Sequence, residues 1–254
     1  MTRVSGIVVS HGHARELESL LPRLAVQVDE LVVVANMPGS VPGEVPARVR
    51  VLENARPRRL AENINLGIAA TRGEWVAFAN PDVVPAFDAV AVLVAFAESR
   101  ARCGIAGPRT VWPDGTWQPT RRRFPTVRGT LVRRTPLRRL VPPLERQRDH
   151  YHLDEDVDEP VEADWLLGAF LLMRRTMLEE LGGWDEGYRH YVEDIDLCYR
   201  AMRAGWERWY VPSARVTHDW AQVTDRGFLT KHTLWHARSM ARFVREHPET
   251  LARL

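Results

Sequence analysis

The chain has 254 residues, of which 45% are hydrophobic and 27% are charged, so it can bury a substantial core in one large domain or two small ones. Its net charge of +2 gives no overall attraction to nucleic acid, and its two cysteines are too few for a disulfide framework, so we expect a cytoplasmic protein. The N-terminus lacks a basic segment before a long apolar run, and no apolar stretch approaches the roughly 20 residues that span a bilayer, so we expect neither a signal peptide nor a transmembrane helix.

The first half of the chain alternates predicted strands and helices. Helical spacing is clearest in residues 14–24, where leucines recur every three or four positions. Strands separated by helices predict an α/β fold with a Rossmann-like, mostly parallel sheet flanked by helices on both faces. The predicted strands are 4–9, 31–35, 49–52 and 74–79, and the predicted helices are 14–24, 60–70 and 86–99.

Polar residues follow three of these strands. Ser10 and His11 come after the first strand, Asn36 after the second, and Asn80-Pro81-Asp82 after the fourth. Ligands on parallel sheets bind at the carboxyl ends of the strands. We therefore expect these residues to converge at one edge of the sheet.

The second half is less regular. Residues 113–116 predict a hairpin turn between Trp112 and Trp117. Ten arginines then fall between residues 121 and 148, and an acidic block follows, so we expect 120–160 to form a long excursion rather than a domain linker. The elements predicted after it are strand 166–173, helices 176–181 and 193–204, strands 209–211 and 214–217, and a terminal helix over 228–247.

Three acids, Glu193, Asp194 and Asp196, occupy four positions at the start of a predicted helix. Acids favour a helix N-terminus through the macrodipole, which accounts for one of the three. Like charges this close repel, so one acid is a candidate to take a proton from an incoming hydroxyl. Together with Asp82 at a strand end, the cluster indicates a divalent metal site and a base in one cleft.

Seven segments, in order over roughly residues 4–220, resemble the inverting nucleotide-sugar glycosyltransferases of family 2, which have the GT-A fold, and in particular a rhamnosyltransferase-like subgroup. The resemblance implies a single GT-A domain over 1–254. Within it, about 1–110 would bind the nucleotide sugar, about 111–220 would form the acceptor and catalytic half, and 221–254 would form a C-terminal helix. The matching segments are 7–10, 61–67, 80–82, 164–170, 182–186, 191–197 and 211–214, the last leading to His218.

The resemblance implies that Asp82 binds a Mg²⁺ or Mn²⁺ ion on the donor diphosphate, and that His218 completes the metal site. A hard cation with oxygen ligands would stabilise the charge that develops on the leaving group. The alternatives are that Asn80-Pro81-Asp82 is a turn or a cap for the helix starting near Ala86, and that His218 is structural.

The resemblance also implies that Asp194 is the general base. It would take the proton of the acceptor hydroxyl, whose in-line attack inverts the anomeric carbon. Burial and the neighbouring acids raise the pKa of such a base. Glu193 belongs to the same catalytic pair. Glu193 and Asp196 are expected to position Asp194, the acceptor or an arginine.

The nucleotide pocket departs from the family pattern, because Ala35 stands where an acid usually contacts the base. Asn36 can replace that contact, His11 can stack on the base, and one arginine of the group that includes Arg59 can meet a phosphate. The expected donor-binding residues are Ser10, His11, Asn36, Arg59, Asn63, Asn80 and Asp82.

The acceptor side is expected to offer flat aromatic faces and close backbone approach. Trp165 and Trp184 are also good core material, and that alternative stays open. The expected acceptor-binding residues are Asp164, Trp165, Gly168, Ala169, Trp184 and Asp185.

The implied reaction is transfer of an L-rhamnosyl group from dTDP-rhamnose to a hydroxyl of a glycan, lipid-linked or small-molecule acceptor, with UDP-hexose or GDP-mannose as alternative donors. A non-catalytic nucleotide-sugar or glycan-binding protein is the rival. The arginine-rich 121–148 segment has three interpretations: a solvated face, which we favour, a lid over the diphosphate, or a peripheral contact with the inner face of the membrane. A homodimer stays open, and nucleic acid is not expected as a partner.

Overall fold

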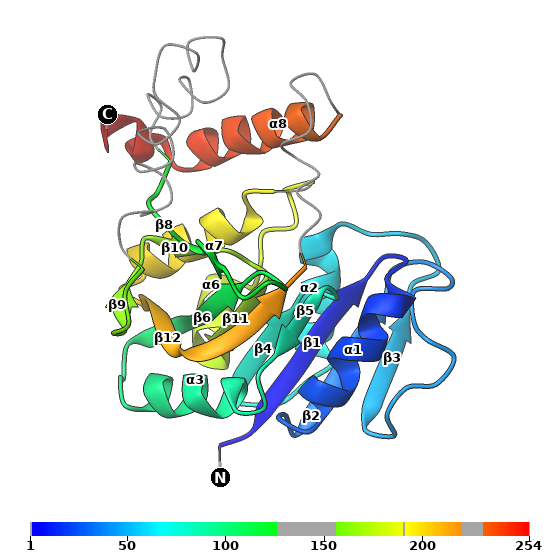
Figure 1. Ribbon diagram of the computed structural model, residues 1–254. Helices are drawn as coiled ribbons and strands as arrows, with labels where there is room; N and C mark the ends of the chain where they lie inside the picture. The colour runs from blue at the N-terminus through cyan, green and yellow to red at the C-terminus, as the bar shows by residue number, and fades with distance from the viewer. Residues whose placement is uncertain (1, 126–155, 190, 220–230, 254) are drawn as a thin grey trace.

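The computed structural model describes residues 2–125, 156–189, 191–219 and 231–253, without the side chains of 231–233 and 251–253. The described chain forms an α/β fold around one mixed sheet in the order β3-β2-β1-β4-β11-β6-β12-β5, with β7 beside β6 and β9 beside β12 (Figure 1). The expected sheet of mostly parallel strands with helices on both faces is confirmed.

The first half follows the predicted alternation closely. Four parallel strands pair in the order β3-β2-β1-β4, so that Ser10 lies beside Ala35 at one edge of the sheet. These elements are β1 (Val4–Ser10), α1 (Ala14–Ala25), β2 (Glu30–Ala35), β3 (Val49–Glu53), α2 (Leu60–Ala69), β4 (Trp75–Ala79) and α3 (Ala89–Glu98).

The sheet continues with one strand that the sequence did not predict, β6 (Cys103–Val111), which lies between β11 and β12. It pairs with β11 (Phe170–Arg174), which runs antiparallel to both β6 and β4. Two glycines and a proline in β6 resemble a loop sequence. Close packing requires one of these glycines, because a Cβ at Gly104 would lie 2.5 Å from the Met177 sulfur.

Three further boundaries differ from the prediction. The predicted strand 166–173 is divided into β10 (Trp165–Leu166) and β11. The two predicted strands 209–211 and 214–217 form one strand, β12 (Glu207–His218), whose register on β6 shifts between Val211 and Arg215. A short strand, β5 (Val83–Pro85), pairs antiparallel with β12.

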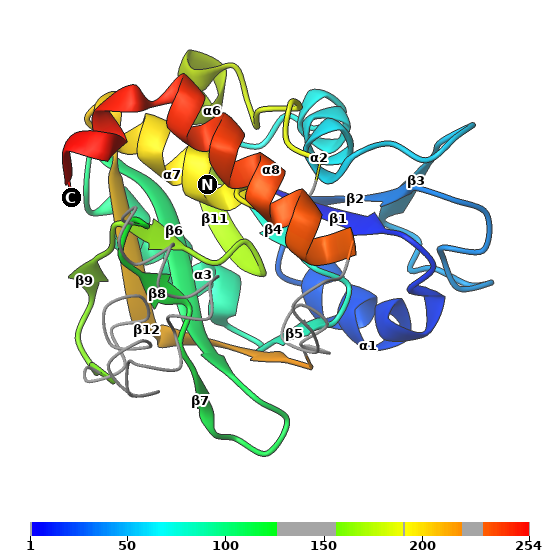
Figure 2. The same ribbon diagram turned by 90° about the horizontal axis from the view of Figure 1, so that it is seen from above.

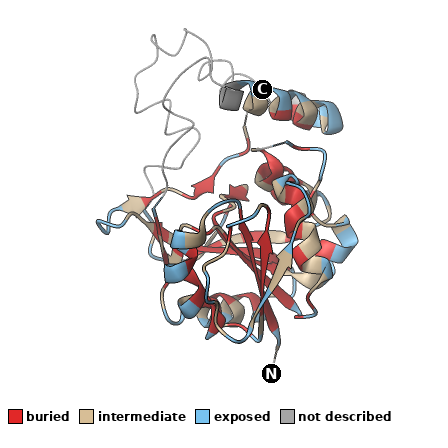
Figure 3. Cartoon of the chain, turned by 90° about the vertical axis from the view of Figure 1, so that its right-hand side faces the viewer, coloured by how far each residue is buried: buried red, intermediate tan, exposed pale blue. Residues whose placement is uncertain are grey.

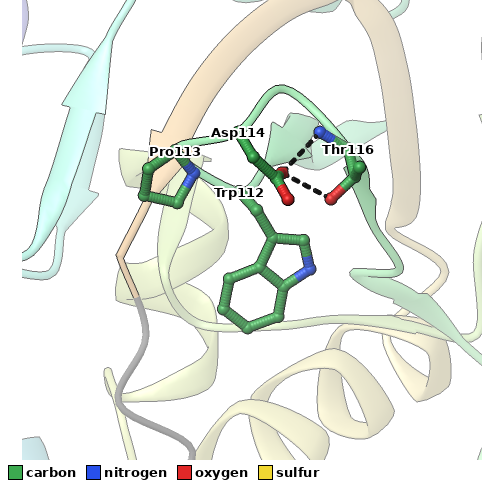
Figure 4. A pocket seen from close by; sticks show the side chains of 4 residues that line it. All are labelled: Trp112, Pro113, Asp114 and Thr116. Carbon is green, nitrogen blue, oxygen red and sulfur yellow. Dashed lines mark hydrogen bonds between the residues drawn. The ribbon is translucent and has the colours of Figure 1, made fainter.

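The hairpin predicted after Trp112 is confirmed. β7 (Trp117–Gln118) pairs antiparallel with the end of β6, and Figure 4 shows the turn between the two strands. The predicted excursion over 120–160 is described only at its ends, because 126–155 lie outside the described residues. The described ends include β8 (Arg121–Arg122), which pairs with β10, and β9 (Val161–Glu162), which pairs with β12.

Two apolar cores lie on the two faces of the sheet, and buried residues follow the strands (Figure 3). Leu17 of α1 and Leu93 of α3 belong to one core. The other core includes side chains from α2, α6 (Arg175–Leu181), α7 (Glu193–Arg203) and α8 (Lys231–Glu246). A short 3₁₀ helix, η3 (Pro248–Arg253), follows α8, which crosses above α7 (Figure 2). In the part of the chain that is described, none of the helices has the length and apolar character to cross a bilayer.

Gly73 joins α2 to β4 where the chain passes close to β1. A Cβ at this position would lie 2.6 Å from the Ser5 nitrogen and 2.9 Å from the Arg3 carbonyl oxygen, both backbone atoms. We predict that Gly73→Ala lowers the free energy of unfolding by about 1–3 kcal/mol, since the backbone must shift to admit the methyl group. Urea denaturation measures this.

Gly43 provides the matched control, because nothing lies within 4 Å of a Cβ built there. Gly43→Ala is expected to stay within about 0.5 kcal/mol of the parent protein. Equal denaturation midpoints for the two variants would contradict the close approach at Gly73.

Candidate active site

The helix that carries the acidic cluster begins with a strained turn. Tyr191 and Val192 both have left-handed backbone conformations, with φ of 67° and 75°. This region is costly for a β-branched residue, and such strain is typical of functional sites. Val192 is nonetheless buried in the core. The turn fixes the direction in which the first residues of α7 leave the loop.

Asp194 is held by two backbone N–H groups. Gly168 N donates to Oδ2 at 3.0 Å and Ile195 N donates to Oδ1 at 2.9 Å. A Cβ at Gly168 would lie 3.3 Å from the Asp194 Cβ, so glycine permits this approach. Burial raises the pKa of the Asp194 carboxyl, and the Gly168 N–H and the Arg122 charge oppose that rise. A fixed carboxylate with a raised pKa suits a general base.

Glu193 is a second acid with an unusual environment. Only 6% of the residue is exposed, and its buried Oε2 has no hydrogen-bond partner among the described residues. Burial and the charge of the neighbouring Asp194 raise the pKa of Glu193 to about 8. The side chain is therefore largely neutral at pH 7.

Asp196 has a structural role in the same turn. It accepts hydrogen bonds from Arg200 Nε at 2.7 Å, His247 Nε2 at 2.8 Å and Tyr188 Oη at 3.1 Å. Burial alone would raise its pKa, but the bonds from His247 and Arg200 lower the pKa of Asp196 below its usual value. This carboxylate ties α7 to the segment between α8 and η3.

Asp82 and His218 meet where β5 and β12 pair. His218 lies opposite Val83, and its Nε2 is 3.4 Å from Asp82 Oδ1. That oxygen is buried and has no hydrogen-bond partner in the part of the chain that the structure describes. The other ring nitrogen, Nδ1, is 2.8 Å from Gln118 Oε1. An amide oxygen only accepts, so Nδ1 carries the proton, and in the neutral ring Nε2 presents its lone pair.

A carboxylate oxygen and an imidazole lone pair that face each other form a plausible pair of metal ligands, with Gln118 as the outer-shell group that fixes the ring. Over residues 2–125, 156–189, 191–219 and 231–253, no group of three or more His, Cys, Asp or Glu side chains could hold a metal. The alternative that Asp82 caps the following helix is wrong, because α3 begins at Ala89 and Asp88 occupies its N-cap.

One turn joins the candidate base to the candidate metal pair. Gly168 binds Asp194, and the carbonyl of Ala169, the next residue, accepts a hydrogen bond from Asn80 N at 2.8 Å. Asn80 is two residues before Asp82. The structure therefore brings together predicted residues from three separate segments of the chain.

An amide network lies at the edge where β1 and β2 end. The Asn36 Oδ1 accepts from Asn54 Nδ2 at 2.9 Å and from Arg58 N at 2.8 Å, and its Nδ2 donates to Arg58 O at 2.9 Å. Asn54 also donates to Asn63 Oδ1 at 2.6 Å. These amides organise the loop before α2. For Asn36 to bind the nucleotide base, one of these hydrogen bonds would have to break. The sequence did not single out Asn54.

Ser10 and His11 differ in accessibility. The Ser10 hydroxyl is buried and donates to the Ser40 carbonyl at 2.6 Å, which fixes the loop after β1. His11 is exposed, and its Nδ1 lies 3.0 Å from Asn36 Nδ2. The His11 ring is thus available at the carboxyl end of β1.

Arg59 lies at the start of α2 and reaches toward the second half of the chain. Its Nη1 donates to the Glu186 carbonyl at 3.0 Å and to the Gly187 carbonyl at 3.4 Å. The residue is exposed and its guanidinium has five N–H donors, so it can also meet a phosphate.

The two tryptophans predicted on the acceptor side are core residues. Trp165 is 3% exposed and donates through Nε1 to the Arg123 carbonyl at 2.8 Å. Trp184 is 2% exposed and packs against Phe78. The indole rings of Trp165 and Trp184 therefore fit the alternative interpretation, in which both residues belong to the core.

The two predicted acids on the acceptor side have protein partners. Asp164 Oδ2 accepts from Phe124 N at 2.8 Å. Asp185 forms an ion pair of 2.8 Å with Arg242 of α8. Both acids hold loops that surround the first turn of α7.

Arg121 and Arg122 are buried, which contradicts a fully solvated arginine block at its first two positions. Arg122 lies over the Trp165 ring, 4.9 Å from its centroid, and its charge lowers the pKa of Asp194. Nothing in the sequence distinguishes these two residues from the later arginines of the block. Those beyond Arg123 lie outside the described residues.

Known proteins resemble this chain over most of its length. Residues 23–245 match the family described as "Glycosyltransferase like family 2". The N-acetylglucosaminyl-diphospho-decaprenol L-rhamnosyltransferase of Mycobacterium tuberculosis is 32% identical, over 96% of this chain and 85% of the relative. The rhamnosyltransferase WbbL of Escherichia coli K12 is 24% identical, over 94% of this chain and 91% of the relative.

The crystal structure of GalNAc-T7 with UDP, GalNAc and Mn²⁺ has the same fold. It superposes with a TM-score of 0.65 at 18% identity, over 96% of this chain and 48% of that longer chain. The predicted GT-A fold is confirmed, and the protein belongs to the family 2 glycosyltransferases.

Proposed function

We propose that this glycosyltransferase moves an L-rhamnosyl group from dTDP-rhamnose to a hydroxyl of a glycan or lipid-linked acceptor, with inversion at the anomeric carbon. The observation that carries the proposal is the Asp194 carboxylate, fixed by Gly168 beside the turn that leads to Asp82. The two relatives named as rhamnosyltransferases support the choice of sugar.

Asp194 is the proposed general base. As the acceptor oxygen bonds to the anomeric carbon, the hydroxyl proton passes to the Asp194 carboxylate, and the bond from that carbon to the diphosphate oxygen breaks on the opposite side. The raised pKa of Asp194 increases its basicity. The Gly168 and Ile195 N–H groups hold the Asp194 carboxylate in a fixed orientation during the transfer.

Glu193 complements this base because it is largely neutral. A second ionised acid beside Asp194 would repel the charge of the base and of the departing diphosphate. Protonated Glu193 avoids that repulsion and retains a proton with which to donate a hydrogen bond. We therefore assign it a positioning role next to Asp194.

Asp82 and His218 would hold a Mg²⁺ or Mn²⁺ ion. When bound, such an ion would neutralise the negative charge of the donor diphosphate. The buried Asp82 Oδ1, which has no hydrogen-bond partner among the described residues, and Nε2 of the neutral His218 ring fit a cation between them. Gln118 would keep the imidazole in the required tautomer.

The remaining assignments follow the same division of the chain. Residues 1–110 would bind the nucleotide sugar, with His11 and Asn36 near the base. Residues 111–220 would form the acceptor and catalytic half, and 221–254 the C-terminal helix. The proposed location is cytoplasmic, and the proposal leaves open a peripheral membrane contact through the 121–148 segment and a homodimer.

We predict that Asp194→Asn lowers transfer by roughly 10²–10⁴-fold while nucleotide affinity changes less than twofold, since only proton transfer is lost. Rates with dTDP-rhamnose and an acceptor panel, and calorimetric titration with dTDP, measure the two effects. Asp88→Asn is the control, because Asp88 is an exposed acid at the start of α3. Full transfer by Asp194→Asn would remove the base assignment. Nucleotide binding without any transfer by the parent protein would favour the non-catalytic rival.

Nucleotide binding should depend on the metal. Titration of dTDP, UDP and GDP with and without Mg²⁺ or Mn²⁺ is expected to show tight, metal-dependent binding of dTDP. Asp82→Asn and His218→Ala should each weaken that metal-dependent binding by at least roughly tenfold, because each removes a ligand. Asp88→Asn again serves as the control. Unchanged metal dependence in both variants would place the metal elsewhere.

Glu193 should make the folded protein less stable as pH rises. Its folded pKa of about 8 lies above the ordinary value of 4.5, so the folded state holds a proton that the unfolded state has released. The stability that Glu193 contributes is then fully present below pH 4.5 and falls towards pH 8, by roughly 1.4 kcal/mol per pH unit at most. We predict that Glu193→Gln removes this slope and unfolds at a higher temperature than the parent at pH 8.

Calorimetric melting temperatures between pH 5 and pH 9 test this. The exposed Glu44 supplies the control, and Glu44→Gln should follow the parent profile at every pH. Parallel profiles for Glu193→Gln and the parent would show that Glu193 is ionised in the folded protein.

A further inference from the structure

Two of the segments that match the family pattern, 61–67 and 182–186, meet through the side chain of Asn65. Trp184 N donates to Asn65 Oδ1 at 2.9 Å, and Asn65 Nδ2 donates to the Trp184 carbonyl at 2.8 Å. The carboxamide of Asn65 thus pairs with both backbone polar groups of one residue, as a neighbouring strand would. Among side chains of this length, only a carboxamide both donates and accepts in this way.

The loop over residues 183–186 is built around this carboxamide. Gly183 has a left-handed backbone with φ of 79°, and a Cβ there would lie 2.6 Å from Asn65 Oδ1. A side chain at 183 would therefore displace the amide. Asn65 Nδ2 also donates to Glu186 Oε1 at 2.9 Å, so one side chain holds both ends of the loop. Figure 2 shows this part of the chain, in yellow-green, passing from α6 to the side of α2.

Trp184 connects the loop to the candidate base. Its buried Nε1 has no hydrogen-bond partner among the described residues, so the indole is held by packing against Phe78 and by the backbone that Asn65 fixes. A Cβ at Gly168 would lie 3.7 Å from Trp184 Cη2 and 3.5 Å from Asp194 Oδ2. The indole and the carboxylate therefore border the same glycine, whose N–H donates to Asp194.

We propose that Asn65 is a positioning residue for the general base. Its carboxamide clamps loop 183–186, the loop holds Trp184 against Gly168, and the Gly168 N–H stays directed at Asp194. The inference rests on the proposed glycosyl transfer, in which Asp194 takes the acceptor proton. Because Asn65 belongs to α2, the clamp joins the nucleotide-sugar half of the chain to the catalytic half.

The variant Asn65→Ala removes both hydrogen bonds to Trp184. We expect kcat to fall by roughly 10-fold to 100-fold, because a displacement of about 1 Å in a catalytic group has an effect of this size. The dTDP affinity and the KM for dTDP-rhamnose should change less than about twofold, since the lost interaction acts on the base and not on the donor. Rates with dTDP-rhamnose and an acceptor panel, and calorimetric titration with dTDP, measure these effects.

Gly73→Ala is the control matched for stability. It is expected to destabilise the connection after the same helix, where the atoms around its Cβ belong to Arg3 and Ser5 and not to loop 183–186. At temperatures where both variants are folded, Gly73→Ala should keep the parent kcat. An equal fall of kcat in the two variants would reduce the effect of Asn65 to general stability and overturn the positioning role.

Amide hydrogen exchange in the full chain tests the clamp without any reaction. In Asn65→Ala, the Trp184 and Gly168 N–H groups should exchange about tenfold faster relative to Val8 N–H, because local hydrogen bonds are lost. Val8 lies in the central strand β1, paired on both sides, and so reports global unfolding. In Gly73→Ala this ratio should equal that of the parent. An unchanged ratio at Gly168 in Asn65→Ala would overturn the clamp.

The two measurements separate failure of this inference from failure of the proposed transfer. A parent protein that transfers sugar, together with Asn65→Ala at the parent kcat, would overturn the positioning role alone. A parent protein that binds dTDP but transfers no sugar would overturn the proposed transfer, and the positioning role with it.

Discussion

The candidate active site depends on the hydrogen bond from Gly168 N to the Asp194 carboxylate. Glycine at 168 favours this contact, because a Cβ there would lie only 3.3 Å from the Asp194 Cβ and would push the first turn of α7 away. The next residue, Ala169, accepts a hydrogen bond from Asn80, so the same turn fixes the loop that carries Asp82. One short turn therefore sets the relative position of two acids that are 112 residues apart in the sequence.

Three neighbouring acids at the start of α7 are accommodated in three different ways. Asp196 is ionised and surrounded by donors from α7 and from the segment after α8. Glu193 is buried, and burial together with the charge of Asp194 raises its pKa to about 8. Asp194 lies between them, with two backbone donors and a raised pKa. The repulsion expected from the sequence is thus relieved by protonation on one side and ion pairing on the other.

The sequence predicted the alternating first half because each strand there is apolar and each helix has a clear spacing. It missed β6, whose glycines resemble a loop, although one of them, Gly104, packs closely against Met177. It located the segments of the site but not the partners of each side chain. Burial of Trp165 and Arg122 arises from long-range pairing of β8 and β10, and Trp184 is buried against Phe78 of β4; no local pattern encodes either contact.

The C-terminal helix belongs to the architecture of the site although it contributes no candidate ligand. Arg242 of α8 pairs with Asp185, and His247 beyond its end pairs with Asp196, so both sides of the loop before α7 are attached to one helix. Val192 in that loop has a left-handed conformation that a free chain would avoid. Contacts on either side of a strained residue oppose its relaxation, and they act on the turn that orients Glu193 and Asp194. The position of the base is thereby linked to the packing of α8.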